Sequence, residues 1–194
     1  MARSCPQNAG APRTSGSQTG KFLLIYGSLF LFGAAANTAY HWGSLTHPNL
    51  LAAPEDADSW QVHGVGTAHA TLRREGGTLR LDIASVDGVA QHLQCFQRGV
   101  NLQEGHDYTL KFRSRSDVLR DVQVAALLDQ PDYHNVGLKK ITPLLPVWQT
   151  FTYTFRVTHP LTNDTSVPCF MLGNKSGTVW LADVSVTEVR RHRG

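Results

Sequence analysis

Apolar and polar residues alternate along most of the chain after residue 49. In segments 78–85, 108–114, 121–128 and 149–157, every second residue is apolar. Successive side chains of a strand point to opposite faces, so this period of two predicts half-buried strands. Turn sequences such as Gly76-Gly77 and Asp87-Gly88 separate them. Because no amphipathic helix is predicted between them, we expect roughly eight to ten short strands in an all-β, antiparallel sandwich over residues 49–189.

A different pattern precedes this region. Residues 22–42 contain no charged side chain, and Lys21 lies directly before them. About twenty helical residues span the hydrocarbon core of a bilayer, so we expect one transmembrane helix over residues 21–42. Tyr40 and Trp42 fit the far membrane interface. The alternative is a signal peptide, because the small residues 34–36 are typical of a cleavage site.

The segments around this run predict its topology. Residues 1–20 are rich in Gly, Ser, Pro and Thr, which predicts a tail that is disordered unless a partner binds it. Arg3, Arg13 and Lys21 precede the run, and no acidic residue occurs before Glu55. The N-terminus is therefore expected in the cytoplasm, and the main domain on the periplasmic or extracellular side. Residues 43–48 form a tether that holds this domain within about 20 Å of the bilayer.

The net charge of the chain is carried by its ends. The formal net charge is +3, but three cations precede residue 22 and three more lie in the basic tail 190–194. Without these six cations, the rest of the chain carries a charge of −3. A weakly acidic domain lacks the basic surface that nucleic acid requires, so this class of partner is excluded.

The cysteines leave two alternatives open. Cys5 falls in the predicted cytoplasmic tail, whereas Cys95 and Cys169 fall in the main domain. An oxidising compartment permits a disulfide between the latter two. The strand patterns do not clearly place both on one face, so a disulfide and two buried thiols are both compatible with the sequence.

No motif indicates catalysis. The nine histidines are scattered, without HxH or HExxH spacing. No GxSxG, no P-loop and no GxGxxG before a helix is present, so we expect a protein that is not an enzyme. Asn163 and Asn174 begin sequences that fit N-glycosylation sites.

Three segments together resemble the family 4/9 carbohydrate-binding modules, which are jelly-roll β-sandwiches. They are GHDYTLKFRSRSD (105–117), VWQTFTYTFRV (147–157) and GTVWLADVSV (177–186), and Asn49-Leu50-Leu51 starts the domain as such modules start. The resemblance implies a non-catalytic fold that holds sugars on a concave sheet by aromatic stacking and by side-chain hydrogen bonds. We expect Trp148 and Trp180 to be packing residues.

The resemblance also suggests where a ligand or partner binds. It assigns the face to residues 92–98 and to a neighbouring strand over residues 121–128. The outward side chains expected there are His92, Gln94, Phe96, Gln123, Ala125 and Leu127, and the candidate rim residues are Tyr133, His134 and Trp60.

These outward residues are of two kinds. Gln94, Phe96 and Gln123 suit a sugar, whereas Ala125 and Leu127 offer neither stacking nor hydrogen bonds. This mixture is more typical of a protein contact.

The resemblance further implies a structural calcium ion. Related folds often hold calcium with oxygen ligands between their first and last strands. Asp183 matches a ligand position, and Glu55, Asp56 and Asp58 are its candidate partners. The alternative is that Asp183 caps a turn or bonds to the backbone.

Two functional hypotheses follow. The first is an accessory subunit of a larger membrane complex, for example a respiratory or photosynthetic one, anchored by a single span. The short tether and the aliphatic outward residues favour it. The alternative is a membrane-tethered or secreted carbohydrate-binding module.

Overall fold

The computed structural model describes residues 48–129, 133–158 and 165–189. The predicted span 21–42, the tails 1–20 and 190–194, and most of the tether lie outside these ranges. In the described part of the chain, no helix is long and apolar enough to cross a membrane.

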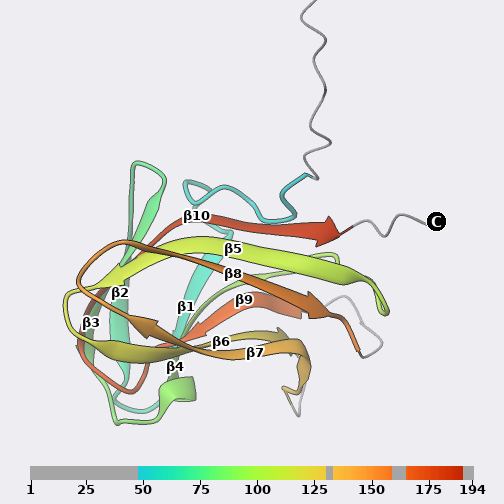
Figure 1. Ribbon diagram of the computed structural model, residues 1–194. Helices are drawn as coiled ribbons and strands as arrows, with labels where there is room; N and C mark the ends of the chain where they lie inside the picture. The colour runs from blue at the N-terminus through green and yellow to red at the C-terminus, as the bar shows by residue number, and fades with distance from the viewer. Residues whose placement is uncertain (1–47, 130–132, 159–164, 190–194) are drawn as a thin grey trace, which may run out of the picture. The chain divides into compact units, whose positions relative to one another are not determined.

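Ten strands, all paired antiparallel, form two sheets of five that pack face to face (Figure 1). The strands are β1 (Trp60–Gly64), β2 (His69–Glu75), β3 (Thr78–Ser85), β4 (Leu93–Arg98), β5 (Asp107–Ser116), β6 (Arg120–Leu128), β7 (Asn135–Leu144), β8 (Gln149–Arg156), β9 (Thr165–Met171) and β10 (Gly177–Val189). One 3-10 turn, η1 (Ala90–His92), precedes β4. The predicted all-β sandwich is confirmed.

The sheets follow the orders β1-β4-β9-β6-β7 and β2-β3-β10-β5-β8. Figure 1 shows β5, β8 and β10 in one layer above β6, β7 and β9 in the other. The strand over residues 121–128 was expected beside the one over 92–98, and this expectation is wrong. Strand β9 lies between β4 and β6 and bonds to both.

The predicted alternation determines the core. The inward residues of β3, β5 and β6 are buried, whereas their alternate neighbours are mostly more exposed. Phe112 of β5 contacts Phe170 of β9 edge to face, with ring centroids 5.1 Å apart. Because these two rings come from different sheets, their contact joins the layers. Full burial of one such side chain contributes about 2 to 3 kcal/mol.

Asn49 fixes the start of the domain. Its Oδ1 accepts hydrogen bonds from the amides of Leu51 and Val186, at 3.2 and 2.9 Å. Its Nδ2 donates to the carbonyl of Val184 at 3.3 Å. One amide side chain thus attaches the first described residues to β10, near the other end of the domain sequence.

Arg120 is a buried cation that joins two connections of the sandwich. Its side chain is 3% exposed and donates to Ser116 Oγ and to the carbonyls of Lys175 and Ser176, at 2.9, 2.9 and 2.7 Å. Burial lowers the pKa of Arg120, and the nearby Asp117 carboxylate opposes this shift. The side chain therefore holds the β5–β6 connection against the β9–β10 turn.

Replacing Arg120 with alanine is expected to lower the free energy of unfolding by about 3 kcal/mol, because two carbonyls lose a charged donor. Urea unfolding of the full chain, followed by tryptophan fluorescence, measures this change. Lys140→Ala removes an exposed cation and is expected to change the free energy by less than about 0.5 kcal/mol. Equal effects of the two substitutions would contradict the structural role of Arg120.

The register of β4 and β9 decides between the two alternatives for the cysteines. Cys95 lies opposite Phe170, and Cys169 lies opposite Phe96. Opposed residues share a face and successive residues alternate, so Cys95 points into the core and Cys169 to the outer face. Both are buried free thiols. Burial raises the pKa of Cys95, and it raises the pKa of Cys169 from 9.0 to about 12.

These pKa shifts predict a loss of stability in alkali. Both thiols stay protonated in the folded chain while the unfolded thiols ionise above their ordinary pKa of 9.0. Stability from this source is complete below that value and falls as the pH rises toward the folded values. Each buried thiol is expected to lower the free energy of unfolding by about 1.4 kcal/mol at about pH 10.

Urea unfolding at about pH 8 and about pH 10 tests this prediction on the full chain and on its Cys95→Ala/Cys169→Ala variant. The variant is expected to lose about 3 kcal/mol less than the original chain between these conditions. Parallel losses would show that the folded thiols ionise as freely as the unfolded ones.

Candidate functional site

Two adjoining hollows lie on the outer face of the sheet β1-β4-β9-β6-β7. Their volumes are about 390 and 370 Å³. They share the lining residues Gln91, Gln94, Leu127 and Tyr133, so they form one cleft that runs across the strands. The first hollow is also lined by His63 of β1, by His92 of η1, and by Phe96 and Arg98 of β4. The second hollow is also lined by Gln123, Asn135, Lys139 and Met171.

The floor of the cleft is a small apolar cluster, separate from the main core. It consists of Phe96, Ala125, Leu127, Cys169 and Met171, and each is at most 9% exposed. Ala125 and Leu127 lie on the outer face as expected, but they are only 0% and 9% exposed, so they lack the exposure that a protein contact needs. The insertion of β9 places Cys169 and Met171 beside them, and the five side chains exclude solvent from one another. The argument for a protein contact depended on that exposure and therefore fails.

Two glutamine side chains stand over this floor. Gln94 donates to the carbonyl of Gln91 at 2.8 Å and accepts from the Cys169 thiol at 3.3 Å. Gln123 donates to the Met171 sulfur at 2.8 Å. Thiols and thioethers are weak hydrogen-bonding partners, so a ligand hydroxyl can displace them at little cost.

An arginine–carboxylate ion pair and a histidine–carboxylate hydrogen bond lie at the wall of the first hollow. Arg98 bonds to Asp129 at 2.8 Å, and its guanidinium lies 5.4 Å from the centre of the Phe96 ring. His92 Nδ1 lies 2.5 Å from the carboxylate of Asp87, and this hydrogen bond lowers the pKa of Asp87. Arg98 is thus paired with a carboxylate of the cleft wall, whereas no ion pair is seen for Lys139 of the second hollow among the described residues.

The three candidate rim residues have different positions. Tyr133 has a positive φ of 40°, is 64% exposed and borders both hollows. His134 is half-buried and does not belong to the lining of either hollow, and its carbonyl accepts from the amide of Leu128.

Trp60 is not at this site. It is 2% exposed and stacks on Phe170 in the main core, with centroids 6.4 Å apart. The β1–β4 register explains its position, because Val62 opposes the inward Cys95 and Trp60 shares the face of Val62.

Asp183 is the candidate calcium ligand. It has a φ of 52° at a bulge of β10, and its exposed carboxylate pairs with Arg113 at 3.2 Å. Among the described residues, no three His, Cys, Asp or Glu side chains gather as metal ligands. Asp183 is thus paired with an arginine, and the structural calcium ion stays a prediction.

Sequence reasoning missed several cleft residues. Cys169 and Met171 alternate with inward residues, but nothing local indicates that their strand enters this sheet. Arg98 and Asp129 come from the ends of β4 and β6, and no motif joins them. The alternation did place Gln94, Phe96 and Gln123 on one face, as observed.

Several solved structures share this fold. A module described as CBM4 is 26% identical, with a TM-score of 0.59, over 69% of this chain and 90% of that one. The second N-terminal cellulose-binding domain of Cellulomonas fimi β-1,4-glucanase C is 19% identical, with a TM-score of 0.59, over 75% and 97%. The first such domain of that enzyme is 22% identical, with a TM-score of 0.53, over 69% and 90%.

Comparison of the sequence itself gives the family. No curated protein matches this chain. The family model for the carbohydrate binding domain of types 4 and 9 matches residues 54–177, which is more than half of the chain. The resemblance inferred from the three sequence segments is thereby confirmed for the sandwich, and the chain belongs to this carbohydrate-binding domain family.

Proposed function

We propose that the sandwich binds a carbohydrate chain, without catalysis, in the cleft across β1, β4, β9, β6 and β7. The observation that supports this most directly is the combination of an apolar floor, two amide side chains and one exposed tyrosine. A sugar ring has apolar faces and a polar rim, so it needs these partners together.

The shape and charge of the cleft specify the ligand further. The two hollows adjoin, which suits several sugar units in a row better than a single one. Arg98 is neutralised by Asp129, and His92 is held by Asp87. A neutral glycan chain therefore fits better than an acidic one. The cellulose-binding domains of Cellulomonas fimi make β-glucans the first ligands to try.

The first hypothesis from the sequence, an accessory subunit of a membrane complex, receives no support from the comparisons and stays a prediction. The same holds for the membrane anchor and the periplasmic or extracellular location, since residues 21–42 lie outside the described ranges. The family favours the alternative hypothesis, a carbohydrate-binding module.

Titration calorimetry of the full chain in neutral detergent tests the proposal, with cello-oligosaccharides, xylan and mixed-linkage glucan as ligands. At least one is expected to bind. Tyr133→Ala is expected to weaken binding about ten-fold, because about 1.4 kcal/mol of ring contact is lost. Gln123→Ala removes a hydrogen-bonding amide and is expected to have a similar effect.

Val147→Ala serves as the matched control. Val147 is equally exposed but lies in the β7–β8 connection and does not border the cleft. The Val147→Ala variant is expected to bind the neutral glycans as tightly as the original chain. Absence of binding to every neutral glycan, or equal weakening by Val147→Ala, would refute the proposed site.

A further inference from the structure

The other sheet carries a row of alternating arginine and tryptophan side chains on its outer face. We name this arginine–tryptophan row by its members, Arg113, Trp148, Arg115, Trp180 and Arg80. The Arg115 guanidinium lies 5.4 Å from the Trp148 ring centre and 4.1 Å from that of Trp180. Arg113 lies 5.2 Å from Trp148, and Arg80 lies 5.8 Å from Trp180. The two tryptophans, expected as packing residues, belong to neither apolar cluster and contact guanidinium groups on the surface, where Trp148 is 38% exposed.

The row runs across the strands. Trp180 of β10 lies opposite Arg80 of β3 on one side and opposite Arg115 of β5 on the other. Trp148 precedes β8, the strand that pairs with β5. Four separate segments therefore contribute, and only the order β3-β10-β5-β8 brings them together.

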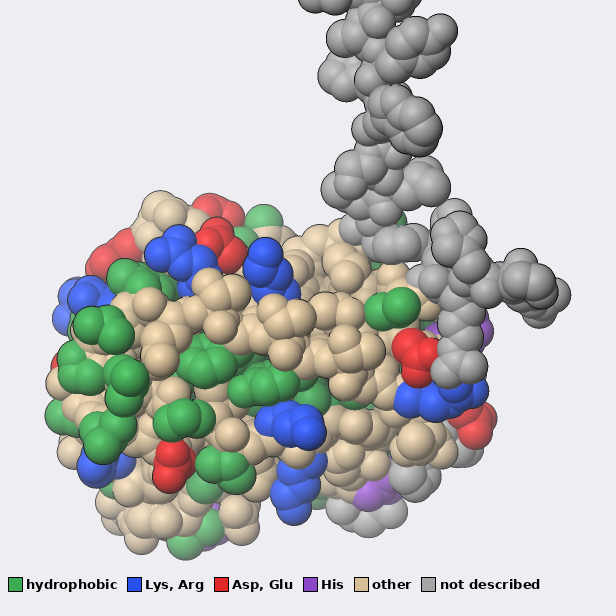
Figure 2. Space-filling model, viewed as in Figure 1, with side chains coloured by type: hydrophobic (Ala, Val, Ile, Leu, Met, Phe, Trp, Pro, Cys, Tyr) green, Lys and Arg blue, Asp and Glu red, His purple; other side chains and the backbone are tan. Residues whose placement is uncertain are grey.

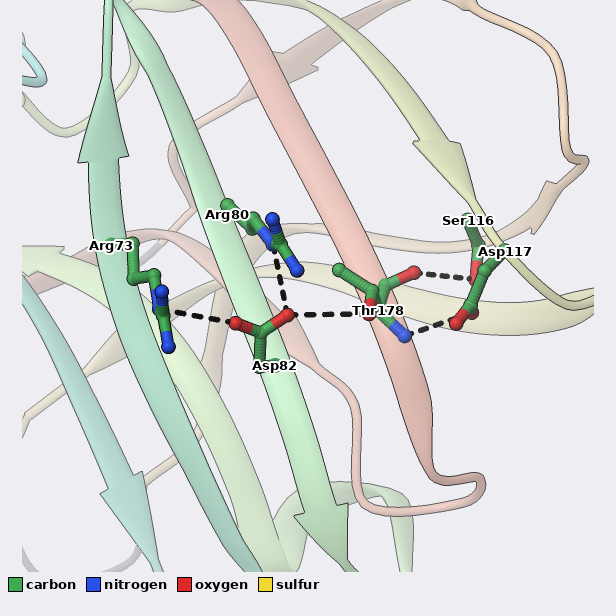
Figure 3. Close-up of polar contacts among 6 residues, drawn as sticks. All are labelled: Arg73, Arg80, Asp82, Ser116, Asp117 and Thr178. Carbon is green, nitrogen blue, oxygen red and sulfur yellow. Dashed lines mark hydrogen bonds and ion pairs between the residues drawn. The ribbon is translucent and has the colours of Figure 1, made fainter.

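Positive charge exceeds negative charge along the row. Arg80 shares the carboxylate of Asp82 with Arg73, at 2.9 and 3.3 Å, as Figure 3 shows. Asp82 also accepts from the Thr178 hydroxyl at 3.3 Å, so its oxygens are well occupied. Asp183 pairs with Arg113 at 3.2 Å. Four arginines, Arg73, Arg80, Arg113 and Arg115, are thus matched by two paired carboxylates, Asp82 and Asp183.

Within the row, Arg115 is the arginine that no described carboxylate pairs with. No carboxylate pairs with it among the described residues, and its buried Nε finds no hydrogen-bond acceptor there. The tryptophan rings hold its guanidinium in place. Because the Arg115 side chain is already ordered, little conformational entropy is lost when an external anion binds to it.

The surface beside the row is polar and carries charges of both signs. Thr150, Thr152 and Thr154 of β8 are exposed, and Thr152 lies opposite Lys111 of β5. Figure 2 shows Lys and Arg side chains, mixed with Asp and Glu, over the layer that contains β5 and β10. Since the chain without its tails has a charge of −3, the excess of arginine over paired carboxylate in the row is a local feature.

We propose that this outer face is a second binding site, for an acidic polysaccharide that carries carboxylate or sulfate groups. Guanidinium groups bind both anions with paired hydrogen bonds, and threonine hydroxyls complement sugar hydroxyls. The row extends across several strands, which suits a repeated anion along a polymer. Its tryptophan faces are covered by arginine, so charge replaces ring stacking as the means of recognition.

This site is independent of the cleft. The cleft lies on the outer face of the opposite sheet and holds paired charges, and none of its lining residues belongs to the row. A chain with both sites can hold a neutral and an acidic polysaccharide at the same time, one on each face of the sandwich.

Retention of the full chain on immobilised polygalacturonate and on immobilised dextran sulfate, in neutral detergent, tests the second site. The chain is expected to be retained at low salt and released as salt rises. Arg113→Gln/Arg115→Gln is expected to bind at least about ten-fold more weakly to soluble forms of the polymers. The basic tails are the same in both proteins, so they do not explain a difference.

Lys140→Gln/Lys175→Gln is the matched control, because it removes the same charge from exposed lysines outside the row. Its binding is expected to stay within about two-fold of the original chain. Arg115→Lys keeps the positive charge but loses the paired donors of the guanidinium group. This variant is expected to bind the polymers more weakly than the original chain but more tightly than Arg113→Gln/Arg115→Gln. Near-ultraviolet circular dichroism establishes that each variant keeps the folded environment of its aromatic residues.

Three results would overturn the second site. They are no retention of the original chain on either polymer, equal weakening in the lysine control, and binding to phosphatidylglycerol vesicles without binding to the polymers. Tyr133→Ala is expected to bind the acidic polymers normally. If the chain binds no neutral glycan in the cleft, its binding to the acidic polymers is still expected. Each of the two proposals can therefore be refuted without the other.

Discussion

The rest of the structure depends on the insertion of β9 between β4 and β6. All seven residues of this strand are buried, because both of its faces are covered. On the inner face, Phe170 meets Phe112 of the opposite sheet and joins the two layers. On the outer face, Cys169 and Met171 complete the floor of the cleft. A shift of one residue in its register would exchange these faces and remove the core contact and the floor together.

The two outer faces of the sandwich have opposite chemical characters. One is hollowed, with an apolar floor, amide groups and charges that pair within the wall. The other has stacked guanidinium and indole groups and an unpaired arginine. The close-packed core between them holds both surfaces rigid, so each can be prepared for its ligand before binding. If both proposals hold, one small domain has two binding surfaces that do not compete for space.

Much of the fold could be predicted because the signal is local. Alternation identified the strands and their inward residues, since a buried face needs apolar side chains at every second position. It also placed Gln94, Phe96 and Gln123 on a common face. It failed for Trp60, where the choice of face depended on the pairing of β1 with β4. It failed again for the exposure of Ala125 and Leu127, because their neighbours come from a strand more than forty residues away in the sequence.

The sequence by itself determined the all-β class, the inward set of most strands and the family. These depend on side-chain periodicity and on short segments, which are readable without any partner. The tertiary structure decided the strand order. With it came the cleft floor, the placement of the two free thiols on opposite faces of their sheet, and the arginine–tryptophan row. The physical reason is that each of these features joins side chains from strands distant in the sequence. No residue carries a local signal that tells which strand will lie beside it.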